Sequence, residues 1–171
     1  IEVNTLFSRK DGNFYVCNQS LYEEVCKYAD EKKIAVLNLI PTTSFYLRIR
    51  EIPSGSDVYI LNNRRPYCET LEKLCMSMEL KDYHFIQVPF AEIDREKLKE
   101  ILKNATYVIG VKNIIDEFLQ DSEFQGYLPQ NSEIIKAQRV ISVSSTGELI
   151  SKLDRLLLDK SRALLSILDE Q

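Results

Sequence analysis

The fold class follows from the stretch between Asp57 and Met78, which reads DVYILNNRRPYCETLEKLCMSM. An apolar run rich in β-branched residues over 57–61 indicates a strand, and a polar turn follows it. Pro66 suits the first turn of a helix. Beyond it, apolar residues recur at helical spacing, at Tyr67, Leu71, Leu74, Cys75 and Met78. We therefore predict a strand, a turn and a helix whose apolar stripe belongs to the core.

The same alternation of short apolar runs and helical periodicity continues on both sides of this unit. Further strands are predicted over residues 2–7, 14–17, 34–40, 84–88, 106–111 and 139–143, and further helices over residues 20–30, 94–103 and 113–119. Ser20 and Glu23 have the spacing of a capping box at the start of the first helix. Residues 34–37 and 107–110 are apolar throughout, which is typical of interior strands. The chain is therefore predicted to be an α/β protein with a mostly parallel sheet flanked by helices, flavodoxin-like or Rossmann-like.

The domain organisation is predicted from a turn-rich segment and from the C-terminal pattern. Residues 53–56, Pro-Ser-Gly-Ser, precede a strand and are the predicted joint between two lobes. The expected parts are an N-terminal α/β lobe over 1–52, a C-terminal α/β lobe over 53–148 and a long helix over 149–171. Because the chain begins at Ile1 and stops within a helical pattern, we expect a fragment of a longer protein with an incomplete first lobe.

The composition argues against several classes of function. The chain has 22 basic and 26 acidic residues, a net charge of -4 and no basic cluster, so direct contact with nucleic acid is not expected. It has neither an apolar run that could cross a membrane nor a signal peptide, which indicates a cytoplasmic protein. The cysteines lack C-x-x-C spacing and are predicted to be buried apolar residues, without a disulfide or a metal: Cys17, Cys26, Cys68 and Cys75.

The motifs of common catalytic and cofactor sites are missing from the sequence. His84 is the only histidine and is expected at the start of a buried strand, so a structural role is predicted for it. The five glycines form no G-x-S-x-G, G-x-G-x-x-G or P-loop pattern. Adjacent carboxylates such as Asp116 and Glu117 do not face each other on a helix. We expect no catalytic residue, cofactor or metal, although Cys17, the only thiol at a strand end, leaves a small-molecule enzyme of flavodoxin-like fold as an alternative.

Polar loops at the carboxyl ends of the strands are the candidate ligand site, because open parallel sheets bind their ligands there. Hydroxyls that open a helix, with cations nearby, suit a small anion or carboxylate. The alternative is that these hydroxyls are ordinary helix caps and that the asparagines only form turns. The predicted ligand-binding residues are Asn62, Asn63, Arg64, Lys112, Asn113, Ser144, Ser145 and Thr146.

The C-terminal segment carries one uninterrupted helical pattern from Thr146 to Gln171. Its apolar residues alternate in steps of three and four, and Lys160 interrupts them. For the distal half of the helix this seam predicts pairing with a second copy of the chain or continuation into a following domain. Residues 149–157 are expected to pack on their own domain, and the same packing beyond them is the alternative. The seam residues are Ile150, Leu153, Leu157, Leu164 and Ile167.

Four stretches carry a resemblance to a known family. They are SLYEEV at 20–25, IPSGSDVYILN at 52–62, YHFIQVPF at 83–90, and RVISV at 139–143 with the later pairs ST and LI. In these stretches the chain resembles the N-terminal sensory region of bacterial PAS-containing regulators of the sigma-54-dependent activator type. The resemblance covers most of residues 14–158. It departs from the family in the glycine-rich turn, which is present only as Ile-Gly-Val-Lys at 109–112, and in a first strand and helix that do not precede Ile1.

The resemblance implies a regulatory function. In that family the region precedes a PAS domain and often an ATPase and a DNA-binding module, so the terminal helix would be the connecting signal helix. The resulting hypothesis is a non-catalytic sensory domain of a transcriptional regulator or signalling protein, which relays ligand or partner binding through its C-terminal helix as a homodimer. A protein-interaction module without a small ligand remains the main alternative.

Overall fold

The computed structural model describes residues 14–124 and 126–169, and the predicted strand over 2–7 lies outside that part of the chain. The chain divides into two compact units, one of Ile1–Ile40 with Ile141–Gln171 and one of Pro41–Val140. Each unit has a sheet whose strands pair in parallel. The predicted α/β class, with helices flanking a parallel sheet and a long C-terminal helix, is confirmed.

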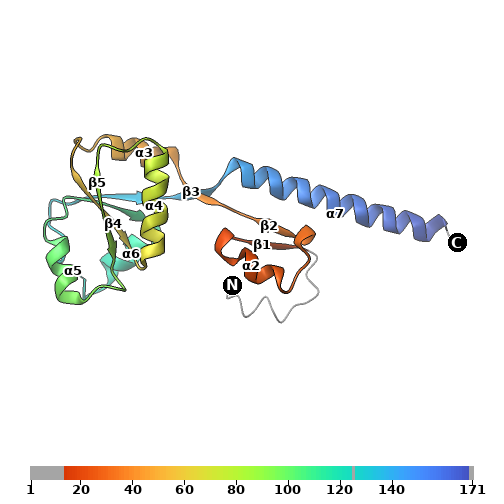
Figure 1. Ribbon diagram of the computed structural model, residues 1–171, viewed down its shortest axis with the longest axis horizontal. Helices are drawn as coiled ribbons and strands as arrows, with labels where there is room; N and C mark the ends of the chain where they lie inside the picture. The colour runs from red at the N-terminus through yellow and green to blue at the C-terminus, as the bar shows by residue number, and fades with distance from the viewer. Residues whose placement is uncertain (1–13, 125, 170–171) are drawn as a thin grey trace. The chain divides into compact units, whose positions relative to one another are not determined.

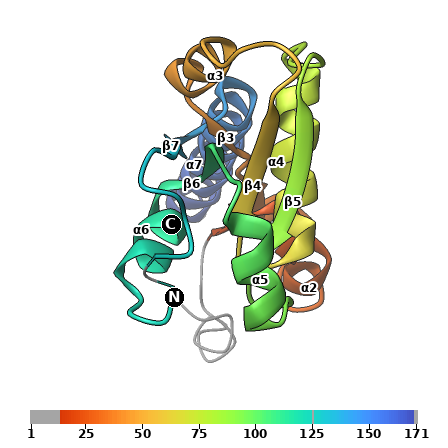
Figure 2. The same cartoon turned by 90° about the vertical axis from the view of Figure 1, so that its left-hand side faces the viewer.

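The second unit is a four-stranded parallel sheet with helices on both faces (Figures 1 and 2). The strands lie in the order β5-β4-β6-β7, with β4 at Asp57–Asn62, β5 at His84–Pro89, β6 at Tyr107–Val111 and β7 at Glu133–Ala137. Its helices are α3 (Thr43–Arg50), α4 (Arg65–Ser77), α5 (Arg95–Leu102) and α6 (Lys112–Gln120). This order places the crossover between β4 and β6, in the middle of the sheet.

The core of this unit has one layer on each face of the sheet. Val58 and Ile60 of β4 pack in the layer that contains residues of α3 and α4, and Tyr59 and Leu61 pack in the layer that contains residues of α5 and α6. Successive side chains of a strand point to opposite faces. A strand covered on both faces therefore has apolar residues at consecutive positions, which explains the unbroken apolar run in β4.

The predicted apolar stripe of α4 is correct in part. Leu71 and Cys75 are buried, but Tyr67 and Met78 are 55% and 42% exposed. Cys68, which was not counted in the stripe, is fully buried instead. The face that packs on the sheet is therefore rotated toward Cys68, and the tyrosine and the methionine lie at its margins.

The first unit contains elements from both ends of the chain. β1 (Tyr15–Cys17) pairs in parallel with β2 (Ile34–Val36), and η1 (Gln19–Leu21), α2 (Tyr22–Cys26) and η2 (Glu31–Lys33) lie between them in sequence. The last element, α7, spans Val143–Asp169 and contacts β2 and η2. The predicted helix over 20–30 is thus shortened to α2. The turn before it is capped by Asn18, whose side chain accepts a hydrogen bond from the backbone N–H of Leu21 at 3.1 Å.

Two predicted strands differ from the observed ones. The strand expected over 34–40 is split into β2 and β3 (Leu39–Pro41), because the backbone N–H of Asn38 donates to the hydroxyl of Ser145 rather than to a strand. The strand expected over 139–143 ends early, as β8 (Arg139–Ile141). β3 and β8 form a two-stranded sheet. Both α3 and β7 were missed by the sequence interpretation.

The boundary between the units also differs from the expected joint at residues 53–56. The chain divides after Ile40 and again after Val140. The reason is that Phe45, Ile49 and Ile52 are buried in the same core layer as Val58. The C-terminal helix is likewise not a separate part, since it begins at Val143 and packs within the first unit.

Candidate functional site

Five of the eight predicted ligand residues lie at one edge of the sheet in the second unit. The parallel pairing of Val58 with Tyr107 and of Ile60 with Ile109 brings the carboxyl ends of β4 and β6 to the same edge. From there the chain runs into α4 after β4 and into α6 after β6, and these helices contribute to opposite core layers. Sheets of this type bind ligands outside the carboxyl ends of their strands at such a point, so this edge is the candidate ligand site. The residues placed there are Asn62, Asn63, Arg64, Lys112 and Asn113.

The loop after β4 is held in position by hydrogen bonds. Asn62 is 3% exposed, and its side-chain oxygen accepts from the backbone N–H of Asn63 at 2.8 Å. The backbone N–H groups of Phe90 and Ala91 donate to the carbonyls of Asn62 and Asn63 at 2.9 and 3.2 Å. Asn62 therefore shapes the turn and fastens it to the end of β5, and its side chain is already engaged.

The amide of Asn63 is the unsatisfied group of this loop. Its side-chain oxygen is buried and has no hydrogen-bond partner within the described part of the chain. An unpaired buried polar atom costs roughly 1–3 kcal/mol. Rotation of the amide exchanges its oxygen for its NH₂ group, so the same position can accept from a ligand or donate to one. A small polar ligand at the sheet edge would relieve this cost.

The N-terminus of α4 contains a charge of each sign. Arg64 is the N-cap residue, and its side chain is exposed. The backbone N–H of Arg65 donates to the carboxylate of Glu92 at 3.3 Å. A carboxylate from the protein thus already lies where the positive end of the helix dipole would attract an anion. Sequence reasoning missed Glu92, because the loop that carries it has no spacing relation to α4.

The cation predicted on α6 is paired. The Lys112 ammonium contacts Asp116 at 2.7 Å, and Lys136 of β7 contacts the other oxygen of the same carboxylate at 2.6 Å. These two hydrogen bonds lower the pKa of Asp116 from its usual value. Lys112 and Asp116 are four residues apart on a helix, so their pairing could have been predicted from the sequence. Asn113, the neighbour of Lys112, is exposed.

Gly110 permits the close approach of β6 to β4 at this edge. A Cβ atom at this position would lie 2.4 Å from the carbonyl oxygen of Leu61 and 3.0 Å from the side chain of Ile115. The glycine is therefore required by strand packing inside the sheet. It does not form a phosphate-binding turn.

The other three predicted ligand residues lie in the first unit, in the first turn of α7. Ser145 is 3% exposed, and its hydroxyl accepts from the backbone N–H of Asn38 at 2.9 Å. The hydroxyl of Thr146 donates to the carbonyl of Ser142 at 3.1 Å, and the hydroxyls of Ser142 and Ser144 are 3.1 Å apart. The capping group is the hydroxyl of Ser142, which accepts from the backbone N–H of Ser145 at 3.2 Å. The hydroxyls of Ser145 and Thr146 are thus engaged by Asn38, the second residue after β2, and by the Ser142 carbonyl.

The predicted seam of α7 is exposed along its described length. Its described members are more than a third exposed: Ile150 at 53%, Leu153 at 39%, Leu157 at 63% and Leu164 at 64%. The side chain of Ile167 lies outside the described residues. The face that packs on the first unit is a different one, where the Lys152 ammonium donates to the carbonyl of Ile34 at 2.6 Å. Packing within the unit and the apolar seam therefore use separate faces of one helix.

His84 and Cys17, the two candidate reactive side chains, lie in different surroundings. The side chain of His84 is 76% exposed rather than part of a buried strand end, and its Nδ1 lies 3.4 Å from a carboxylate oxygen of Asp57. Cys17 is buried, and burial raises the pKa of its thiol, as does the nearby Cys26, while Lys152 lowers it. A thiol that resists ionisation is a poor nucleophile. Among residues 14–124 and 126–169, no three potential ligands of a metal ion gather.

Comparisons with known proteins do not identify a relative of this chain. No family model, no curated protein and no solved structure matches the chain. Within the described part of the chain, no helix is both long and apolar enough to cross a membrane. The fold defines the chain as an α/β protein with polar residues at the carboxyl ends of β4 and β6 and a long C-terminal helix.

Proposed function

We propose that this chain is a non-catalytic sensory or regulatory domain of a cytoplasmic transcriptional regulator or signalling protein. In this proposal it belongs with the N-terminal sensory regions that it resembles, and other domains follow it. It binds a small anionic or carboxylate ligand, or a partner, and relays that event through α7. The observation that carries the proposal is that α7 is fastened to the first unit on one face and exposes an apolar seam on another.

The elements between the candidate ligand site and α7 follow one another closely along the chain. β6 ends at the candidate ligand site, and β7 pairs with it from Tyr107–Glu133 to Val111–Ala137. β7 leads through Gln138 into β8, which leads through Ser142 into α7. A ligand that shifts the end of β6 would therefore act two elements before the start of the helix. A coupling of roughly 1–3 kcal/mol is enough for an allosteric response.

The output of the relay is self-association through the seam. Complete burial of a leucine side chain contributes about 1.5–3 kcal/mol, so the half-exposed seam residues of two copies contribute on the order of 5–10 kcal/mol together. This gain is comparable to the cost of association, about 4–15 kcal/mol. The resulting homodimer is therefore marginal in this segment, and its stability is sensitive to each seam leucine.

The proposal is tested by sedimentation equilibrium of the chain and two variants. Leu157→Lys places a charge in the seam and is expected to abolish dimerisation. Leu158→Lys is the matched control, because Leu158 is 57% exposed on the same turn but lies off the seam. A wild-type chain that stays monomeric, or equal effects of the two variants, would refute pairing through this seam.

A protein-interaction module without a small ligand is the second candidate. It is favoured by the carboxylates of Glu92 and Asp116, which already occupy the helix terminus of α4 and the ammonium of Lys112. Native mass spectrometry of the purified chain distinguishes the two candidates. An additional small mass that disappears on denaturation supports the ligand-binding domain, and a bare chain supports the interaction module.

A further inference from the structure

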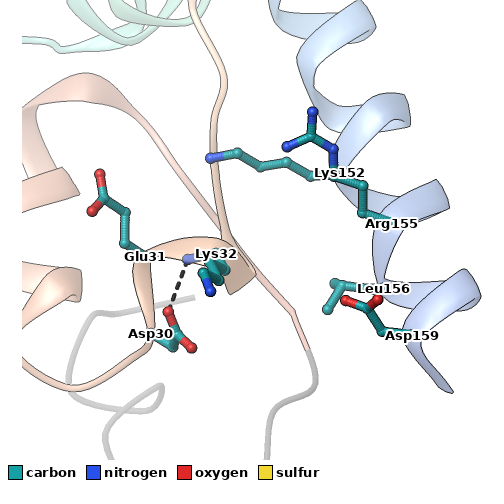
Figure 3. Close-up of a pocket in the computed structure, with 7 residues that line it drawn as sticks. All are labelled: Asp30, Glu31, Lys32, Lys152, Arg155, Leu156 and Asp159. Carbon is teal, nitrogen blue, oxygen red and sulfur yellow. Dashed lines mark hydrogen bonds between the residues drawn. The ribbon is translucent and has the colours of Figure 1, made fainter. Parts of the chain in front are cut away.

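A cavity in the first unit has no part in the function proposed above. It has a volume of about 510 Å³ and lies between η2 and α7 (Figure 3). This volume is within the range of small-molecule sites, roughly 300–1,000 Å³. The lining residues are Asp30, Glu31, Lys32, Lys152, Arg155, Leu156 and Asp159.

The wall formed by η2 is held by its own hydrogen bonds. The Asp30 carboxylate accepts from the backbone N–H of Lys32 at 3.0 Å. The Glu31 carboxylate accepts from the hydroxyl of Tyr22, and Figure 3 shows it directed away from α7. Both acids therefore stabilise the turn through one oxygen each and keep their negative charge, and Lys32 supplies the cation of this wall.

The wall formed by α7 is fastened by Lys152. Its ammonium donates to the carbonyl of Ile34 and forms an ion pair with Glu148 at 3.1 Å. Arg155 and Asp159 are one helical turn apart beyond it, and the apolar side chain of Leu156 lies between them in sequence. Within the described residues, neither Arg155 nor Asp159 has a hydrogen bond or an ion pair from its side chain.

The remaining charges of the cavity have both signs. A ligand with only negative charge would be attracted by Lys32 and Arg155 but repelled by Asp159. A ligand with only positive charge would be attracted by Asp159 but repelled by the two cations. A ligand with a carboxylate and an ammonium satisfies both, because a guanidinium binds a carboxylate through two parallel hydrogen bonds and a carboxylate accepts from an ammonium.

We propose that this cavity binds a small zwitterion of the α-amino acid class. Arg155 and Lys32 hold its carboxylate, Asp159 holds its ammonium, and Leu156 contacts its apolar part. Four of the seven lining residues belong to α7. Occupancy of the cavity therefore fastens the middle of α7 to η2, whatever binds at the sheet edge of the second unit.

The test is isothermal titration of the full chain with each common α-amino acid at up to about 10 mM, a concentration that detects millimolar dissociation constants. Each amino acid that binds is then compared with its N-acetyl and its carboxamide form. Binding of at least one amino acid, weakened at least tenfold by either blocking group, is the expected result, since each blocked form loses one charge-assisted interaction.

Variants assign the binding to this cavity. Arg155→Gln and Asp159→Asn are each expected to weaken binding about tenfold or more. Arg162→Gln is the matched control, because Arg162 is an exposed arginine of α7 outside the cavity, and it should leave binding unchanged. All three positions are exposed, so the variants should fold, which circular dichroism checks. The absence of binding by every amino acid, or binding that is equal in all variants or in the blocked forms, would overturn the proposal.

Discussion

Replacement of Gly110 by alanine should destabilise the second unit strongly. The new Cβ atom would lie 2.4 Å from the carbonyl oxygen of Leu61, which is backbone inside the sheet and cannot rotate away. Ordinary overpacking of a core costs about 1–3 kcal/mol. Because the atom in the way belongs to the backbone of β4, we expect a loss of about 3 kcal/mol or more in the free energy of unfolding. The two strands would be forced apart at the edge that carries the candidate ligand site.

The assay for Gly110→Ala is urea denaturation followed by circular dichroism, with amide hydrogen exchange in β6 as a local probe. With a denaturant slope of about 1–3 kcal/mol per molar, the midpoint should fall by roughly 1 M or more. Gly147→Ala is the matched control, since Gly147 lies in α7 with nothing within 4 Å of its Cβ position. The control should gain about 0.5–1 kcal/mol. An unchanged midpoint for Gly110→Ala would refute the close approach of β6 to β4.

Two further predictions concern buried polar groups. Asn63→Ala removes the unpaired side-chain oxygen, so it should raise the free energy of unfolding by up to about 1–3 kcal/mol in a urea titration, and it should weaken the binding of a ligand at the candidate site. A large loss of stability would show that the amide is satisfied. Burial raises the pKa of Cys68 to about 11 and that of Cys75 to about 12, from 9.0. Because the folded state holds these protons more tightly than the unfolded state, stability should be intact below about pH 9 and should fall as pH rises from there toward 11–12. Urea titrations at several pH values measure this fall, and a Cys68→Ala, Cys75→Ala double variant with the same pH dependence would contradict the assignment.

The seam and the cavity use different faces of α7, which makes the two proposals about this helix independent. Leu157 and Leu164 carry the proposed self-association, whereas Arg155 and Asp159 carry the proposed binding of an amino acid. Disruption of the seam should therefore leave ligand binding intact, and removal of a charge from the cavity should leave the monomer–dimer equilibrium of the free chain unchanged. The two sets of variants serve as controls for each other.

The amino-acid sequence was sufficient for the α/β class and for the strands of the second unit that are buried on both faces. β4 and β6 were predictable because a strand buried on both faces needs apolar residues at consecutive positions, and such a run is visible in the local sequence. The placement of Asn62 and Lys112 at strand ends was predictable for the same reason. The elements α3 and β7 were not predicted. α3 has apolar residues at four of its positions but is only eight residues long, too short to establish a helical period. The five residues of β7 include the charged Glu133 and Lys136, which interrupt its apolar run.

Only the tertiary structure decided which polar groups are already engaged. The hydroxyl of Ser145 bonds to Asn38, and the carboxylate of Glu92 meets α4, through contacts between residues distant in sequence. The sequence shows that a helix begins with serines or cations. It does not show which group, distant in sequence, forms a hydrogen bond or an ion pair with them. The unit boundary after Ile40 has the same origin, because Phe45 and Ile49 join the core that the later strands form. Residue types and spacing thus determined which segments are buried, and long-range packing determined what they are buried against.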